Sequence, residues 1–254
     1  MVRTALACTL ALLSLPTVAF AEGTNGGPGW EYVKTDRDVE VYRKEVPGSG
    51  VVAFKGVTTA NLPIGQLLAV FNDPSERKNW VDRYAEHVTI EKGQYQELYW
   101  IHFGLPWPVS DRDYVLEAKG IADEATRTFK VKIKSVTSPK KGEDDCCVRA
   151  TVIGTYYEFT ALPGAKKTKI VVEVHTDPKG ALPNWLVNLI QKSWPSKTLG
   201  GLVEHTAKIK KAPLPEFANW HDKELPVAKV EEKPAETPTP VDAAPAPAPA
   251  PATP

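Results

Sequence analysis

The chain has 254 residues, of which 42% are hydrophobic and 24% charged, and its 31 Lys and Arg residues balance its 31 Asp and Glu residues. This neutrality excludes the strongly basic surface that nucleic-acid binding requires. Only three cysteines are present and no Cys/His spacing resembles a zinc site, so we expect neither a metal nor another cofactor.

The first 21 residues have the features of a secretion signal. Arg3 precedes a short apolar stretch over residues 5–15, and residues 19–21 (AFA) match an A-x-A cleavage site. The stretch is too short to span a bilayer as a stable helix. We therefore predict a signal peptide over residues 1–21, a flexible linker over residues 22–29, and a secreted or periplasmic protein.

The middle of the chain alternates between apolar and polar residues, which is typical of strands. In residues 129–134 (FKVKIK), the three apolar residues share one face and the three lysines share the other. Further strands are predicted over residues 39–43, 51–59, 88–92, 97–103, 113–119, 148–159 and 169–175. One apolar and one charged face indicate an antiparallel sheet that is covered on a single side.

Two amphipathic stretches are predicted to form helices. The first covers residues 63–71, after which Ser75 is expected to cap a short continuation through Trp80. The second covers residues 182–209 and contains Pro195, where we expect a kink or a break. A curved sheet around one long helix leaves a void between them.

Low-complexity sequence follows. From about residue 227 the chain is rich in Lys and Glu, and residues 245–251 alternate Pro and Ala. Such a segment buries too little apolar surface to offset the entropy of ordering, so we predict a disordered tail over residues 213–254, either inert or a docking string. Because a disulfide between neighbours is strained and rare, the adjacent Cys146 and Cys147 are expected to be two thiols or to form an occasional bridge.

Three segments point to one family. Residues 72–80 (NDPSERKNW), 104–114 (GLPWPVSDRDY) and 181–188 (ALPNWLVN) occur in this order. They resemble, respectively, the D-x-x-x-R/K-x-x-W segment, the loop and strand start, and the opening of the last helix of the START (steroidogenic-acute-regulatory-protein-related lipid transfer) family. The resemblance covers about residues 30–211.

The resemblance implies a helix-grip fold of the α+β class, in which a curved antiparallel sheet wraps around a long C-terminal helix. It places a START-like lipid-binding domain over residues 30–212, with an internal cavity for one lipid or sterol-like molecule. We further expect a monomer without enzymatic activity that contacts membranes transiently.

Some family members place an Arg and a Glu inside the cavity. When this sequence is matched to those members, their Glu corresponds to Glu97 and their Arg corresponds to Ala118. The resemblance therefore implies a carboxylate without a cation, which would resist ionisation and could donate a hydrogen bond to a ligand. The alternative is that Glu97 faces solvent.

Strand alternation and the helix stripe together predict which residues line the cavity. The predicted lining residues are Glu97, Tyr99, Ile101, Phe103, Tyr114, Leu116, Ala118, Val131, Ile133, Val172, Trp185, Leu186, Leu189 and Ile190. For Trp107 two roles are open: a lid that touches a membrane interface, or a core residue packed under the last helix.

Two other functions are open. One is an enzyme, such as a cyclase or hydrolase, that acts on a hydrophobic molecule in the same cavity; the other is an envelope protein that binds a partner through its Pro-rich tail. No common catalytic motif is present, and none of the five histidines is paired in sequence with an orienting group.

The signal-peptide prediction can be tested directly. The cell-associated protein should begin near Glu22, because residues 19–21 form the cleavage site. N-terminal sequencing checks this. A cytoplasmic protein that retains Met1 would contradict it.

Overall fold

The computed structural model describes residues 26–143, 145–182 and 184–222. The predicted signal peptide, and the Pro- and Ala-rich part of the predicted tail, lie outside these residues. The elements in chain order are β1 (Glu31–Asp36), β2 (Val39–Lys44), β3 (Ala53–Ala60), α1 (Ile64–Phe71), the 3-10 helix η2 (Pro74–Asn79), β4 (Tyr84–Lys92), β5 (Gln96–Phe103), β6 (Asp111–Asp123), β7 (Thr128–Ser135), β8 (Cys147–Arg149), β9 (Thr151–Leu162), β10 (Lys167–Asp177), α2 (Asn184–Ile209) and the 3-10 helix η3 (Pro215–Phe217).

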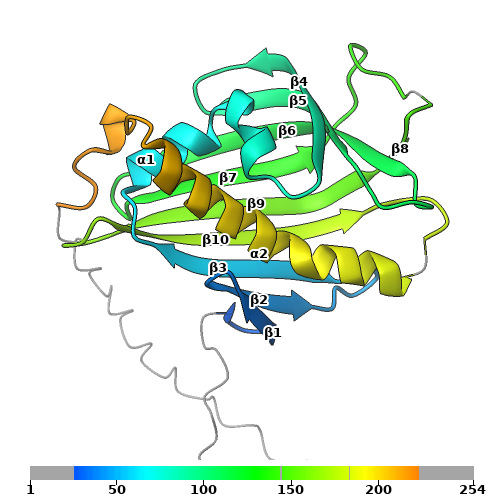
Figure 1. The fold of residues 1–254 in the computed structure, drawn as a ribbon, viewed down its shortest axis with the longest axis horizontal. Helices are drawn as coiled ribbons and strands as arrows, with labels where there is room; N and C mark the ends of the chain where they lie inside the picture. The colour runs from blue at the N-terminus through cyan, green and yellow to red at the C-terminus, as the bar shows by residue number, and fades with distance from the viewer. Residues whose placement is uncertain (1–25, 144, 183, 223–254) are drawn as a thin grey trace, which may run out of the picture.

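The strands form one curved sheet in the order β1-β2-β3-β10-β9-β7-β6-β5-β4. Its neighbours are antiparallel, and the short β8 adds a parallel pairing to β6. Helix α2 crosses one face of the sheet diagonally, with α1 and η2 beside it (Figure 1). The predicted fold class is confirmed: this is a helix-grip architecture of the α+β class.

Two glycines let α2 approach its neighbours closely. A Cβ at Gly56 in β3 would lie 2.9 Å from Cβ of Pro195, and a Cβ at Gly201 would lie 2.6 Å from the carbonyl oxygen of Trp80. Leu199 and Leu202 are fully buried in this half of the helix. The second half of α2 is therefore in direct contact with β3 and with the end of η2.

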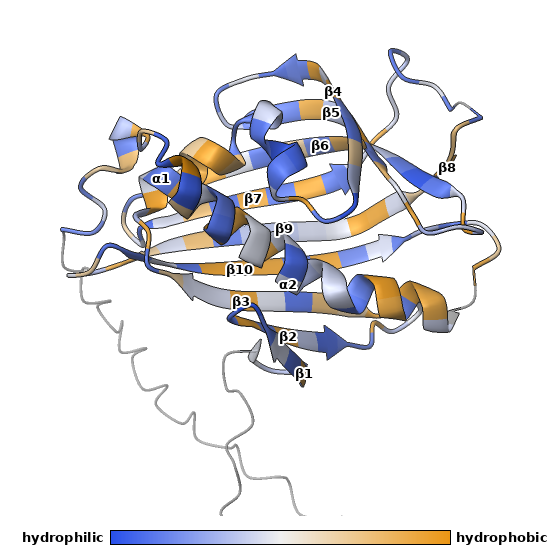
Figure 2. Ribbon diagram, in the orientation of Figure 1, coloured by the Kyte–Doolittle hydropathy of each residue, from blue (hydrophilic) through white to orange (hydrophobic). Residues whose placement is uncertain are grey.

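The two halves of α2 differ in hydropathy. Figure 2 shows hydrophobic residues concentrated in its first turns, whereas the later turns carry many polar residues. The helix continues through Pro195, so of the two predicted outcomes, a kink or a break, the break is wrong. None of the helices in the described ranges is long and apolar enough to span a membrane.

Other expectations also need correction. The strand β1 was not predicted, and the strand predicted over residues 148–159 divides into β8 and β9. Asp73, rather than Ser75, caps η2: its carboxylate accepts a hydrogen bond from the Ser75 backbone N–H at 2.9 Å. Of the two states left open for Cys146 and Cys147, the structure has the disulfide.

The domain extends beyond its predicted boundary at residue 212. Phe217 is only 2% exposed, and Trp220 packs edge-on against it. Nε2 of His221 accepts a hydrogen bond from the Ile64 N–H at 2.9 Å, at the start of α1. Residues 213–222 thus pack on the domain through the buried side chains of Phe217, Trp220 and His221, and the disordered tail predicted from residue 213 does not hold for them. Gly26, in the predicted linker, is also buried.

This packing yields a stability prediction. Phe217→Ala should lower the free energy of unfolding by about 3 kcal/mol, because it empties a fully enclosed aromatic site. Ile121→Ala, a matched change at an exposed position, should cost less than about 0.5 kcal/mol. Urea denaturation measures both. Equal effects would show that residues 213–222 contribute nothing to the core.

An internal cavity as the candidate functional site

A cavity lies between the sheet and the first half of α2. Its volume is about 190 Å³, many times the roughly 10–15 Å³ that one buried water requires. Four cationic side chains and one carboxylate line it, and most of the remaining wall is apolar or aromatic. The space therefore suits a mainly hydrophobic molecule with a limited polar portion.

Most of the predicted strand residues line this cavity. From β5, β6 and β7, these are Glu97, Tyr99, Ile101, Phe103, Tyr114, Leu116, Ala118, Val131 and Ile133. Val172 does not line it: this residue is fully buried beside Gly56, under the second half of α2. Strand alternation gave the correct face in every case, but it could not show where along the sheet the cavity ends.

The predicted helix stripe is wrong for three of its residues. Ile190 lines the cavity, but Leu186 does not, and Trp185 and Leu189 are 68% and 58% exposed. Trp185 and Leu189 instead line an outer groove beside β1 and β3. The cavity face of α2 is formed by Val187, Gln191 and Trp194 together with Ile190.

A buried charge cluster stands at the wall of the cavity, around Glu97, which is 7% exposed. Nη2 of Arg77 donates to its carboxylate at 2.5 Å, and the Thr89 hydroxyl donates to it at 2.7 Å. Nε2 of His87 lies 2.5 Å from Nη1 of Arg77 and 3.2 Å from Oε1 of Glu97. The guanidinium also lies over the Tyr99 ring, 4.6 Å from its centroid.

The expectation of a carboxylate without a cation is therefore wrong. Arg77, which belongs to η2, pairs with Glu97. It supplies the cation that was expected at position 118, where this chain has Ala. Burial alone raises the pKa of Glu97, but its contacts with His87, Arg77 and Thr89 outweigh burial and lower the pKa to about 2. Glu97 is ionised at neutral pH and accepts hydrogen bonds rather than donating one.

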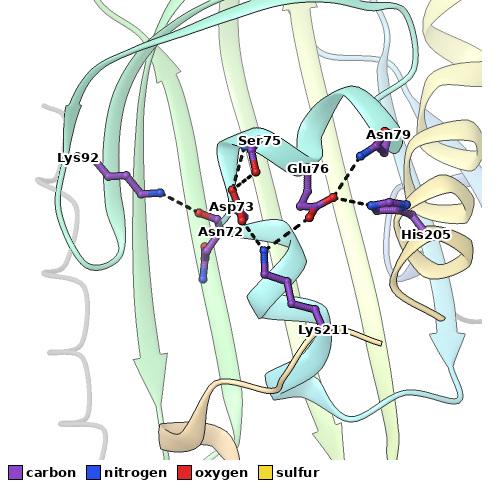
Figure 3. Close-up of polar contacts among 8 residues, drawn as sticks. All are labelled: Asn72, Asp73, Ser75, Glu76, Asn79, Lys92, His205 and Lys211. Carbon is purple, nitrogen blue, oxygen red and sulfur yellow. Dashed lines mark hydrogen bonds and ion pairs between the residues drawn. The ribbon is translucent and has the colours of Figure 1, made fainter. Parts of the chain in front are cut away.

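Ion pairs fix η2, which carries Arg77, to the end of α2. Glu76 accepts from His205 at 2.7 Å, and Asp73 and Glu76 both contact the ammonium group of Lys211 (Figure 3). Burial raises the pKa of Asp73, but its bonds to Lys211 and Ser75 lower it to about 2. Asp73 and Arg77 both belong to the D-x-x-x-R/K-x-x-W segment. This segment therefore supplies the cation of the cluster and a carboxylate that holds η2 in place.

Arg112, in the segment over residues 104–114, bonds to the turn between β10 and α2. Its side chain donates to the carbonyl oxygens of Pro178 at 2.9 Å and Lys179 at 3.0 Å, and also to that of Ser110. The loop after β5 is held by Asp111, which accepts from the Leu105 N–H at 2.7 Å. The chain entering α2 is thus tied to the loop between β5 and β6.

Trp107 lies in that loop and is 93% exposed. The alternative in which it packs under the last helix is therefore wrong. Its exposure is compatible with a contact outside the molecule.

Several lining residues were missed by the sequence analysis. Counting back from the buried Leu202 in steps of three and four residues leads to Trp194, Gln191 and Val187. The polar Gln191 interrupts this stripe, whereas Trp185 and Leu189 supply a second apolar face, and so the wrong face was chosen. The Arg77 motif was visible, but sequence alone did not link it to Glu97.

These features define a class: a helix-grip domain with an internal apolar cavity. The START domain family model matches residues 13–211, and the chain belongs to this family. It is 26% identical over 192 residues to the phosphatidylcholine transfer protein of Bos taurus, covering 73% of this chain and 87% of that protein. An uncharacterized protein of Pseudomonas aeruginosa is 27% identical over 177 residues, covering 68% and 84%.

Solved structures share the fold. Human STARD10 superposes with a TM-score of 0.65 at 23% identity, covering 78% of this chain and 82% of that one. A STAR-related lipid transfer protein fragment from Xanthomonas axonopodis gives 0.62 at 23% identity, covering 70% and 99%.

The buried ion pair yields a prediction about stability and pH. Arg77→Met should cost about 3 kcal/mol, because it leaves the Glu97 carboxylate buried without its cation. Adding Glu97→Gln should restore much of this loss. A double mutant that is no more stable than Arg77→Met would contradict the pairing.

The lowered pKa fixes the sign of the pH effect. The cluster contributes stability above the ordinary pKa of 4.5 and loses it as pH falls toward about 2. Glu97→Gln should therefore lose less stability than wild type over this interval. Urea denaturation at several pH values between these limits measures the difference.

Proposed function

We propose that this protein binds a lipid in its internal cavity and transfers it, without changing it chemically. The observation that carries the proposal is the cavity itself, whose wall is largely apolar and aromatic with one buried, fully paired charge cluster. Membership of the START family supports the same conclusion, because the family is named for lipid transfer.

The ligand class is proposed from the relatives and from the lining. The Bos taurus relative is a phosphatidylcholine transfer protein, which favours a phospholipid over a sterol. A wall that is mostly apolar and aromatic, with a few polar side chains, suits a molecule with long chains and a compact polar part. His87 already contacts both Arg77 and Glu97, so the proposal gives it a structural role rather than that of a catalytic base.

Exposed aromatic and aliphatic side chains support transient membrane contact as the route of lipid exchange. Trp107 projects from the loop between β5 and β6, and Trp185 and Leu189 are exposed on the first turns of α2. An indole side chain partitions well into the membrane–water interface. We propose that this part of the molecule meets the bilayer outside the cytoplasm, after removal of the predicted signal peptide.

Filling the cavity is the test of this function. Ala118→Trp should abolish uptake of a fluorescent phosphatidylcholine and leave the unliganded protein as stable as wild type or more so, because Ala118 lines the void. In a close-packed core the same change would cost about 1–3 kcal/mol. Lipid titration and thermal unfolding measure the two effects.

The matched control is Ala122→Trp, which places the same side chain at an exposed position of β6 outside the cavity. It should bind the lipid as wild type does. If Ala118→Trp binds normally, or if the wild type converts the lipid to a product, the proposed function is wrong.

A further inference from the structure

The outer groove gathers exposed hydrophobic side chains that do not line the internal cavity. Tyr32 of β1 and both Trp185 and Leu189 of α2 are exposed and line this groove, and the buried Phe54 of β3 forms part of its wall. Exposed hydrophobic residues that stand singly are ordinary on a protein surface, whereas a cluster of them marks a binding surface. The groove is therefore expected to bind another segment or molecule.

The lining of the outer groove suits a proline-rich segment. Such segments favour the polyproline II conformation, which docks in grooves lined by aromatic side chains, and Tyr32 and Trp185 supply such rings. Because polyproline II has no internal hydrogen bonds, its carbonyl oxygens need donors from outside. Asn188 and Lys192 lie in the groove and carry donor groups of this kind.

The chain itself carries a segment of the required chemistry. Residues 243–254 contain only Ala, Pro and Thr, so they have no charged side chain that must stay in water. The preceding residues 223–242 contain five acidic residues and three lysines, and the last of the acidic residues is Asp242. The tail thus consists of a charged tether followed by an apolar run rich in proline.

The tether is long enough to bring this run to the groove. Nε2 of His221, near the end of the described chain, accepts from the Ile64 N–H at the start of α1, and the first turns of α2 lie at the opposite end of the domain (Figure 1). Helix α2 has 26 residues and is therefore about 40 Å long. Residues 223–242 can extend over about 65 Å.

Charge favours one direction for the bound segment. Glu31 and Arg43 pair with each other at 2.8 Å, whereas the exposed Lys192 has no ion-pair partner among the residues that the structure describes. A chain that arrives from the C-terminal end of α2 meets Lys192 before Trp185, so Asp242 can pair with Lys192 while the following residues continue toward Trp185. These two positions are about 10 Å apart along the helix, which three or four residues of polyproline II span.

We propose that residues 243–248 dock in the outer groove of the same chain, with Asp242 paired to Lys192 and the prolines packed on Tyr32 and Trp185. This inference does not depend on lipid binding in the cavity. Docking within one chain requires little intrinsic affinity, because a tether holds the segment at an effective concentration on the order of a millimolar. Since Trp185 also belongs to the surface proposed to meet the bilayer, the docked tail covers part of that surface until a membrane displaces it.

A spin label on the tail tests this contact in the full mature chain, without lipid. The label is attached at Ala250→Cys, because Cys146 and Cys147 are bonded to each other, and fluorine NMR follows the protein labelled with 5-fluorotryptophan. The Trp185 resonance, assigned with Trp185→Phe, should lose at least about half of its intensity, because a millimolar effective concentration populates even a weak contact. The Trp100 resonance should keep its intensity, since β5 is five strands away from β3 in the sheet.

Three variants separate docking from chance proximity. Replacing residues 243–249 by alternating Gly and Ser keeps the tether but removes the prolines, and it should restore the Trp185 intensity. Lys192→Glu should weaken docking about threefold, and adding Asp242→Lys should recover it. The matched control is Lys208→Glu, an exposed change on the same helix outside the groove, which should behave as wild type does. Circular dichroism and thermal unfolding confirm that each variant folds.

Four results would overturn the inference. They are an unaffected Trp185 resonance in the full chain, an equal loss of intensity with the Gly-Ser tail, equal effects of Lys192→Glu and Lys208→Glu, and a loss that arises between chains. The last is measured by mixing a spin-labelled chain that lacks fluorine with a fluorinated chain that lacks the label, because a loss in that mixture places the tail in the groove of a second copy.

Discussion

The distance between helix α2 and the sheet changes along the helix, and the internal cavity depends on this change. From Pro195 onward, Gly56 of β3 permits contact with Pro195, and Gly201 of α2 permits contact with Trp80, at distances that no larger side chain would allow. In the first half, Val187 and Trp194 face a void. One half of the helix therefore closes the core, and the other covers a space that strands β5, β6 and β7 line from below.

Polar interactions, rather than core packing, hold the borders of this space. The Glu76–His205 and Asp73–Lys211 pairs fasten η2 to the end of α2, and Arg112 fastens the chain before α2 to the loop after β5. Because these bonds fix the frame, the wall of the cavity can stay apolar without being filled. The cost of burying Arg77 and Glu97 is offset by their mutual pairing and by Thr89.

The charged residues of the cavity differ in whether their polar atoms have hydrogen-bond partners. Glu97 and Arg77 satisfy one another, so neither needs a ligand to complete its bonding. Nη1 of Arg83 and Oε1 of Gln191 belong to two residues that line the cavity, and neither atom has a hydrogen-bond partner among the described residues.

Much of this architecture could be predicted from the sequence, because strand alternation reports the face of each residue directly. Phe129, Val131 and Ile133 were placed correctly on that basis. The phase of α2 could not be settled, since the helix has two apolar faces and the correct one contains Gln191. The Arg77–Glu97 pair joins residues from η2 and β5, and no local pattern connects them. The packing of Phe217 was not predicted, because the prolines near it suggested the start of a disordered tail.

The central claim is that one lipid molecule occupies the cavity of each chain. Native mass spectrometry of the protein after incubation with phosphatidylcholine vesicles, followed by their removal, tests it most directly. The account predicts a single added mass equal to one phospholipid, at a stoichiometry of one per chain. A protein that retains no lipid, or that carries a variable number of lipid molecules, would contradict it.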